Sequence, residues 1–190
     1  ETIGRISIFT AISISHCFRP RFYPMLIVRQ MAEVGYYSLP VVGLTGIFAG
    51  MVLALQSYTG FSRFAAESAI PAVVVLSITR ELGPVLAGLM VAGRVGAAMA
   101  AEIGTMRVTE QIDALTTLST NPFKYLIAPR LIAGTITLPL LVIVADIIGV
   151  LGGYLVSVYK LGFNSDAYIT NTFEFLQTMD VVSGLVKAAV

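Results

Sequence analysis

The chain has 190 residues, of which 56% are hydrophobic and only 12% are charged, and its mean hydropathy is +0.85. Such a composition excludes an ordinary soluble domain and predicts an all-α integral membrane protein, because roughly 20 apolar residues in a helix cross a bilayer core about 30 Å thick. The net charge of +1 also argues against a nucleic-acid partner, which requires a basic face.

The opening segment, residues 1–38, predicts helices at the membrane surface rather than a span. The stretch 25–37 is two-faced, with an apolar side and a polar side that carries Arg29, Gln30 and Glu33. That pattern is typical of a helix in the headgroup region. We therefore expect an interfacial segment over 1–38 and a transmembrane domain over 39–190.

The first predicted span covers residues 39–59 and contains no ionisable side chain. Gly46 and Gly50 form a Gly-x-x-x-Gly pair, which lets another helix approach closely. The far end of this span carries Gln56 and Tyr58, which fit the membrane interface and could also face a substrate path.

The second apolar region, residues 70–106, is too long for one span, since 37 residues in a helix extend about 55 Å. We expect a kink at Gly83-Pro84, because proline removes a backbone donor. Small residues follow at steps of four, including Gly96 and Gly104, and predict a close helix neighbour for this stretch.

A third span is predicted over residues 126–159, with a Gly149-x-x-x-Gly153 pair and one acid, Asp146. A fourth begins near residue 181. Because the sequence stops inside that apolar stretch, we expect a fragment that lacks further C-terminal spans.

The positions of lysine and arginine predict the orientation. Four precede the first span and three lie in 107–130, whereas the segments 60–69 and 160–180 carry one each. The positive-inside rule then places the N-terminus and the segment 107–130 in the cytoplasm.

Five ionisable residues lie within the predicted apolar helices: Arg80, Glu81, Arg94, Glu102 and Asp146. A charged group facing lipid costs several kcal/mol, so these side chains should pair or line a wet cavity. For Arg94, near the middle of its helix, we favour an internal partner such as Asp146. Arg80, Glu81 and Glu102 could instead lie near the interfaces and reach water.

The sequence offers no catalytic or nucleotide-binding machinery of its own. It has no G-x-x-x-x-G-K-[ST] loop, so we expect that any ATP is bound by a partner chain. The lone histidine, His16, and the lone cysteine, Cys17, have no partner at metal-ligand spacing, so we expect no metal and no cofactor. An enzyme acting alone is not expected.

Between the second and third spans, the run "MRVTEQIDALTTLSTNP" predicts a short two-faced helix over about 109–119. We expect Thr109 to cap it and Glu110 and Asp113 to lie in its first turn, where acids complement the helix dipole. Ile112, Leu115 and Leu118 would line its apolar side. It is either a connector resting on the bilayer or a contact for a cytoplasmic partner.

Four motifs resemble the MlaE permease family, the membrane subunits of ABC transporters that move phospholipid between the inner and outer membranes of Gram-negative bacteria. They are "GIFAGMVLALQ", "RELGPVLAGLMVAGRVGAAMAAEIGTMRVTEQIDAL", "NPFKYLIAPRLIAG" and "LPLL". The resemblance implies a polytopic helical bundle with an interfacial helix and five spans, of which this chain would supply three and the start of a fourth. It also implies a homodimer in the bacterial inner membrane.

The same resemblance implies roles for residues and partners. It places a coupling helix at "VTEQIDAL", with Glu110, Gln111, Ile112, Asp113 and Leu115 at a cytoplasmic ABC ATPase. It implies two further partners, a cytoplasmic STAS-domain protein and a periplasmic MCE-domain protein. The lipid would occupy a cavity at the dimer interface, for which we expect Met51, Leu55, Gln56 and Tyr58 as lining residues.

Two alternatives remain from the residues. The first is an ion- or proton-coupled secondary transporter that uses Glu81, Glu102 and Asp146 as a relay. The second is a scaffold that only anchors peripheral proteins. ATP-dependent movement of labelled phospholipid would separate both from an ABC permease.

Overall fold

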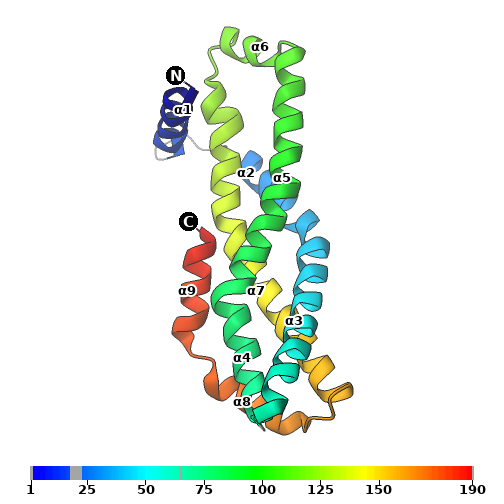
Figure 1. Ribbon diagram of the computed structural model, residues 1–190. Coiled ribbons are helices and arrows are strands. Elements are labelled where there is room, and N and C mark those ends of the chain that lie inside the picture. Colours follow the sequence, from blue (N-terminus) through cyan, green and yellow to red (C-terminus); the bar gives the residue numbers. More distant parts are fainter. Residues whose placement is uncertain (1, 18–22, 65, 190) are drawn as a thin grey trace. The chain divides into compact units, whose positions relative to one another are not determined.

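The computed structural model describes residues 2–17, 23–64 and 66–189, and these residues contain helices and no strand. The stretch 18–22 of the expected interfacial segment, and the side chains of His16 and Cys17, lie outside the described part. The α-helices are α1 (Thr2–Cys17), α2 (Pro24–Val34), α3 (Leu39–Phe61), α4 (Ile70–Ser77), α5 (Gly83–Val108), α6 (Gln111–Thr117), α7 (Ala128–Tyr159), α8 (Ser165–Phe175) and α9 (Thr178–Ala189) (Figure 1).

Three continuous helical stretches are long and apolar enough to cross a membrane: Pro24–Phe64, Glu67–Val108 and Phe123–Tyr159. The shortest has 37 residues, which at 1.5 Å per residue exceeds the thickness of the hydrocarbon core. The predicted all-α, polytopic membrane fold is confirmed, and the chain is an integral membrane protein.

The chain divides into two compact units. Unit 1 comprises Glu1–Tyr37 with Ala92–Thr137, and unit 2 comprises Ser38–Val91 with Leu138–Val190. The helices α5 and α7 each contribute one part to each unit.

In unit 2, α3 and α7 pack at backbone contact through glycine. A Cβ atom placed on Gly50 would lie 1.8 Å from the carbonyl oxygen of Gly149, and one on Gly46 would lie 3.1 Å from that of Ala145. A Cβ on Gly153 would lie 2.7 Å from a methyl carbon of Val74. The two Gly-x-x-x-Gly pairs therefore form one crossing, at which side chains larger than hydrogen have no room.

The kink expected at Gly83-Pro84 is displaced by one turn. The departure from α-helix is a π-helical turn, Ile78–Leu82, in which the Gly83 N–H bonds to the carbonyl of Ile78. Pro84 then lies in the first turn of α5, where a missing N–H costs little. The wider turn changes the hydrogen-bond pattern just before Pro84, which has no N–H to donate. The α-helix resumes at Gly83.

Helix α5 lacks the close neighbour that its small residues predicted. Cβ atoms on Gly96 and Gly104 would meet nothing within 4 Å in the part of the chain that the structure describes. Both residues are exposed. Spacing alone therefore identified a surface that a helix could approach, but none of the described helices occupies it.

In unit 1, aromatic contacts join the first helices to the start of the third long helix. The rings of Phe9 and Phe123 lie 5.5 Å apart, and those of Tyr23 and Tyr125 lie 5.7 Å apart. Gly35, after α2, lies close to Thr137, because a Cβ atom placed on this glycine would be 3.5 Å from the threonine methyl carbon. The segment expected at the interface thus packs against the π-helical turn Phe123–Ile127 and, at Gly35, against α7.

Candidate functional site

Helix α6 is a short exposed helix that links the end of α5 to the segment leading into α7 (Figure 1). Gln111 and Asp113 are exposed, whereas Ile112 and Leu115 are half-buried. The helix therefore presents polar groups to its surroundings and shields two apolar side chains in part, whereas Leu118, expected on the same apolar side, is 74% exposed at the helix end. The structure places Glu110, which is also exposed, immediately before it.

The start of α6 differs from the prediction. Thr109 does not cap the helix, because its hydroxyl donates to the carbonyl of Thr105 at 2.8 Å and so belongs to the preceding turn. The residue before α6 is Glu110, with φ of 57° in the left-handed region. A sharp reversal between α5 and α6 requires that conformation, which costs a non-glycine residue roughly 1–2 kcal/mol.

Asp113 does lie in the first turn of α6, where it pairs with the last turn of α5. Its Oδ1 is 3.0 Å from Nη1 of Arg107. Both side chains are exposed, so the pair contributes little to stability. It does link the first turn of α6 to the last turn of α5.

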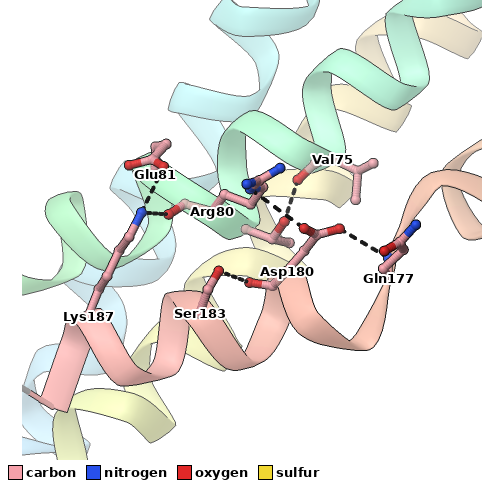
Figure 2. A network of polar contacts seen from close by, with 8 residues as sticks. Val75, Arg80, Glu81, Gln177, Asp180, Ser183 and Lys187 are labelled. Carbon is pink, nitrogen blue, oxygen red and sulfur yellow. Dashed lines mark hydrogen bonds and ion pairs between the residues drawn. The ribbon is translucent and has the colours of Figure 1, made fainter.

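A second polar cluster joins the π turn to α9 in unit 2 (Figure 2). The Nζ atom of Lys187 lies 2.7 Å from Oε1 of Glu81 and donates to the carbonyl of Arg80 at 2.9 Å. The Nε atom of Arg80 lies 3.5 Å from Oδ1 of Asp180. Two residues from an apolar helix thus find opposite charges on a segment about a hundred residues later.

Pro84 explains why Lys187 binds a backbone carbonyl. In an α-helix the residue at position 84 would donate to the carbonyl of Arg80, and proline has no N–H to donate. The lysine ammonium supplies a donor to that carbonyl. Close approach of α9 is possible because Gly184 has no side chain: a Cβ there would lie 2.3 Å from the carbonyl of Thr79.

In unit 1, the predicted intramembrane charges also find partners. Nη2 of Arg130, at the start of α7, lies 2.5 Å from Oε2 of Glu102. Arg94 donates to the backbone carbonyl of Glu33 at the end of α2, rather than pairing with Asp146 as expected. This partner is a neutral backbone carbonyl, which a sequence rule that looks for an opposite charge does not identify.

Asp146 in unit 2 stands apart from these pairs. Its side chain is 7% exposed, and its Oδ1 atom has no hydrogen-bond partner among the described residues. A Cβ atom on Gly83 would lie 1.9 Å from that oxygen, so the carboxyl group lies against the backbone at the start of α5. Gly83 therefore leaves space for this acid in addition to relaxing the turn.

The expected lipid-path residues lie on α3 in different surroundings. Gln56 is exposed and continues a row with Phe48 and Val52 at steps of four, whereas Met51 and Leu55 are half-buried. Tyr58 packs against the buried cluster of Ala54, Ile70, Val74 and Ile78, and its ring lies 6.0 Å from that of Phe163. Tyr58 is thus engaged in packing, while Gln56 ends an exposed apolar row.

Four charged partners were not singled out from the sequence: Arg107, Arg130, Asp180 and Lys187. Lys187 lies in a largely apolar run and Arg130 at the edge of one, so the rule that selected Arg80 and Arg94 also applies to them. Asp180 precedes such a run and carries no comparable signal.

Together, the long apolar helices, the paired charges within them and the exposed helix between two spans define a polytopic membrane protein. The family model described as Permease MlaE matches residues 27–190. The chain belongs to the MlaE permease family, and the resemblance found in its motifs is confirmed.

Relatives agree with this assignment. A probable ABC transporter permease protein of Rickettsia felis is 65% identical over all 190 residues, which correspond to 73% of that protein. The intermembrane phospholipid transport system permease protein MlaE of Haemophilus influenzae is 42% identical over 88% of this chain and 64% of its own length. The chloroplastic protein TRIGALACTOSYLDIACYLGLYCEROL 1 of Arabidopsis thaliana is 37% identical over 86% of this chain and 47% of its own length.

Proposed function

We propose that this chain is the permease subunit of an ABC transporter that moves phospholipid between the inner and outer membranes of a bacterium. A separate cytoplasmic ATPase drives it, with α6 as the coupling helix. The observation that carries the proposal is the form of α6: a seven-residue helix between two spans, with Gln111 and Asp113 exposed and Ile112 and Leu115 half-buried.

Membership in the MlaE permease family supports the transport class, and the name of the Haemophilus relative supports phospholipid as cargo. The assembly we propose is a homodimer with the ATPase and a STAS-domain protein on the cytoplasmic side. An MCE-domain protein stands on the periplasmic side. The N-terminus and α6 are then cytoplasmic, as the distribution of lysine and arginine predicts.

The contact with the ATPase uses the exposed groups Glu110, Gln111 and Asp113, while Ile112 and Leu115 seat the helix on its own protein. Motion of α6 reaches the membrane through α5, because the Arg107–Asp113 pair joins the two helices at their ends. For the lipid we propose the exposed row of α3 that ends at Gln56, with Met51 and Leu55 beside it.

The test replaces two exposed acids by lysine, in the double variant Glu110→Lys with Asp113→Lys. The full-length protein is co-expressed with the candidate ATPase, and co-purification and ATP-dependent transfer of labelled phospholipid are measured. We expect co-purification and lipid transfer each to fall at least about tenfold, because lysine would place positive charge where the proposed contact with the ATPase has negative charge. Asp166→Lys, at an exposed first-turn acid of α8, is the matched control and should change neither.

Normal co-purification and transfer with the double variant would refute the coupling role of α6. The same reconstitution addresses an ion-coupled transporter, for which the specific observation is that Oδ1 of Asp146 has no hydrogen-bond partner among the described residues. That alternative predicts transport driven by a proton gradient without nucleotide. The other two acids of its relay are engaged, since Glu81 binds Lys187 and Glu102 binds Arg130, which favours the ABC permease.

A further inference from the structure

The junction between α4 and α5 has fewer internal hydrogen bonds than a continuous α-helix. In an α-helix the N–H of Gly83 would donate to the carbonyl of Thr79, but in the π turn it bonds to the carbonyl of Ile78 instead. The carbonyl of Arg80 loses its usual donor as well, because Pro84 has no N–H. Two successive carbonyl groups therefore lack their usual helical donors at this junction.

Helix α9 meets both of these carbonyl groups with one face. Lys187 donates from Nζ to the carbonyl of Arg80 at 2.9 Å (Figure 2). Gly184, three residues earlier on α9, lies against the carbonyl of Thr79, because an added Cβ atom would be 2.3 Å from that oxygen. Residues three apart are neighbours on a helix surface, so a single face of α9 brings a small residue to one carbonyl and a cation to the other.

Two ion pairs flank these backbone contacts. The Nζ atom of Lys187 lies 2.7 Å from Oε1 of Glu81, and the Nε atom of Arg80 lies 3.5 Å from Oδ1 of Asp180. The side chains of Arg80, Glu81 and Lys187 are exposed, and ion pairs between exposed side chains contribute little to stability. Contacts of this kind dock α9 on the π turn and still allow it to leave.

The helices on the two sides of the π turn are packed to different extents. Helix α4 is largely buried, with Val74 and Val75 at most 1% exposed. In the first two turns of α5, Val85 and Leu89 are 55% and 63% exposed. Helices bend at π turns, so a bend at this junction moves the start of α5 while α4 stays packed.

We propose that α9 is a releasable clamp on the π turn, and that its contacts at Gly184 and Lys187 fix the angle between α4 and α5. When α9 leaves, the junction becomes a hinge, since a few residues at the ends of two helices absorb the change. Lys187 is the positioning residue of the clamp, because its ammonium group takes the place of the N–H that Pro84 lacks. The inference goes beyond the proposed transport function and does not depend on it, because it concerns contacts within unit 2.

The experiment follows the angle through the distance between two spin labels in the full-length protein. The labels are attached to the cysteines of Leu44→Cys on α3 and Leu89→Cys on α5, two exposed positions of unit 2, after the native cysteines, among them Cys17, are replaced by serine. Pulsed electron paramagnetic resonance gives the distribution of that distance. We expect Lys187→Met to broaden or displace the distribution, because the hinge is then free. Lys160→Met, at an exposed lysine of unit 2, is the matched control and should leave the distribution unchanged.

Pro84→Ala tests whether Lys187 acts through the carbonyl of Arg80. Alanine restores an N–H that can donate to this carbonyl within the helix, and it is a good helix former. We expect the double variant Pro84→Ala with Lys187→Met to give a distribution as narrow as that of Pro84→Ala alone. In a dodecyl sulfate titration, Lys187→Met should lower the unfolding midpoint, and by less in the Pro84→Ala background. Circular dichroism verifies that each variant is helical before labelling.

Glu81→Gln separates the carbonyl contact from the ion pair. Glutamine removes the charge opposite Lys187 and leaves the carbonyl of Arg80 in place, so the distance distribution should stay close to that of wild type. Broadening as large as that caused by Lys187→Met would mean that the ion pair alone holds α9, which overturns the proposed role of the carbonyl.

Two other outcomes would overturn the proposal. A distribution unchanged by Lys187→Met would mean that α9 does not fix the junction between α4 and α5. An equal decrease of the unfolding midpoint with and without Pro84→Ala would mean that Lys187 does not replace the missing N–H.

Discussion

Gly50 is the position at which one added methyl group should do the most damage, because it lies at the crossing of α3 and α7. A Cβ atom on Gly50 would be 1.8 Å from the carbonyl oxygen of Gly149, and real Cβ contacts are essentially never under 3.0 Å. In Gly50→Ala the two backbones must therefore separate by at least about 1.2 Å. A gap of about 0.5–1 Å already forfeits a quarter to a half of the dispersion energy of the atoms that it parts.

Overpacking by one carbon typically costs about 1–3 kcal/mol, and the upper end applies at Gly50 because the obstructing atom is backbone and cannot rotate away. The free energy of unfolding can be measured by titrating detergent-solubilised protein with dodecyl sulfate and following the helical circular dichroism signal. Gly60→Ala is the matched control on the same helix, where a Cβ would meet nothing within 4 Å. It should be neutral or stabilise by about 0.5 kcal/mol.

If Gly50→Ala unfolds at the same midpoint as Gly60→Ala, the close crossing of α3 and α7 is wrong. If both variants are destabilised equally, the loss belongs to glycine in α3 generally and not to the crossing. Only a loss confined to Gly50 supports the reasoning from backbone contact.

Three further predictions concern the other sites. Gly184→Ala should weaken the packing of α9 on the π turn, because the added Cβ would lie 2.3 Å from the carbonyl oxygen of Thr79. Hydrogen exchange across α9 should become faster, and unchanged exchange would contradict the prediction. Glu110→Gly should stabilise the turn before α6 by about 1 kcal/mol, since its φ of 57° favours glycine; slower exchange in α6 is the expected readout, and faster exchange would show that the carboxylate supports the turn. Arg130→Met should lower the free energy of unfolding by about 1–3 kcal/mol. This is less than the loss of a fully buried ion pair would cost, because the Glu102 side chain is 56% exposed. The dodecyl sulfate midpoint measures it, and restoration by Glu102→Gln in the same chain would show that the unpaired acid is the cause.

The Lys187 contact shows how local sequence and distant packing combine. Pro84 is visible in the sequence, and its missing N–H predicts an irregular helix with an acceptor at the carbonyl of Arg80. The sequence does not show that Lys187, about a hundred residues later, donates to that carbonyl. Spacing rules describe one helix at a time, whereas this contact depends on how a second helix folds back.

The same distinction applies to the glycines. The pairs Gly46–Gly50 and Gly149–Gly153 were each identified from their spacing, and the structure brings them together at one crossing. Gly96 and Gly104 also lie among small residues spaced four apart in the sequence. A Cβ atom on either would meet nothing within 4 Å in the described part of the chain. Small residues permit close approach, but the partner helix is chosen by the fold of the whole chain.

The sequence by itself determined the membrane class, the long apolar helices and the short polar helix between two spans, because these follow from the length of apolar runs and from where charges interrupt them. Its motifs also identified the family. Only the tertiary structure decided the partners of the buried charges, such as Arg130 with Glu102 and Arg94 with the carbonyl of Glu33. The physical reason is that hydropathy is a local property of the chain, whereas the partner of a charge in a membrane helix is set by which distant backbone or side chain packs beside it.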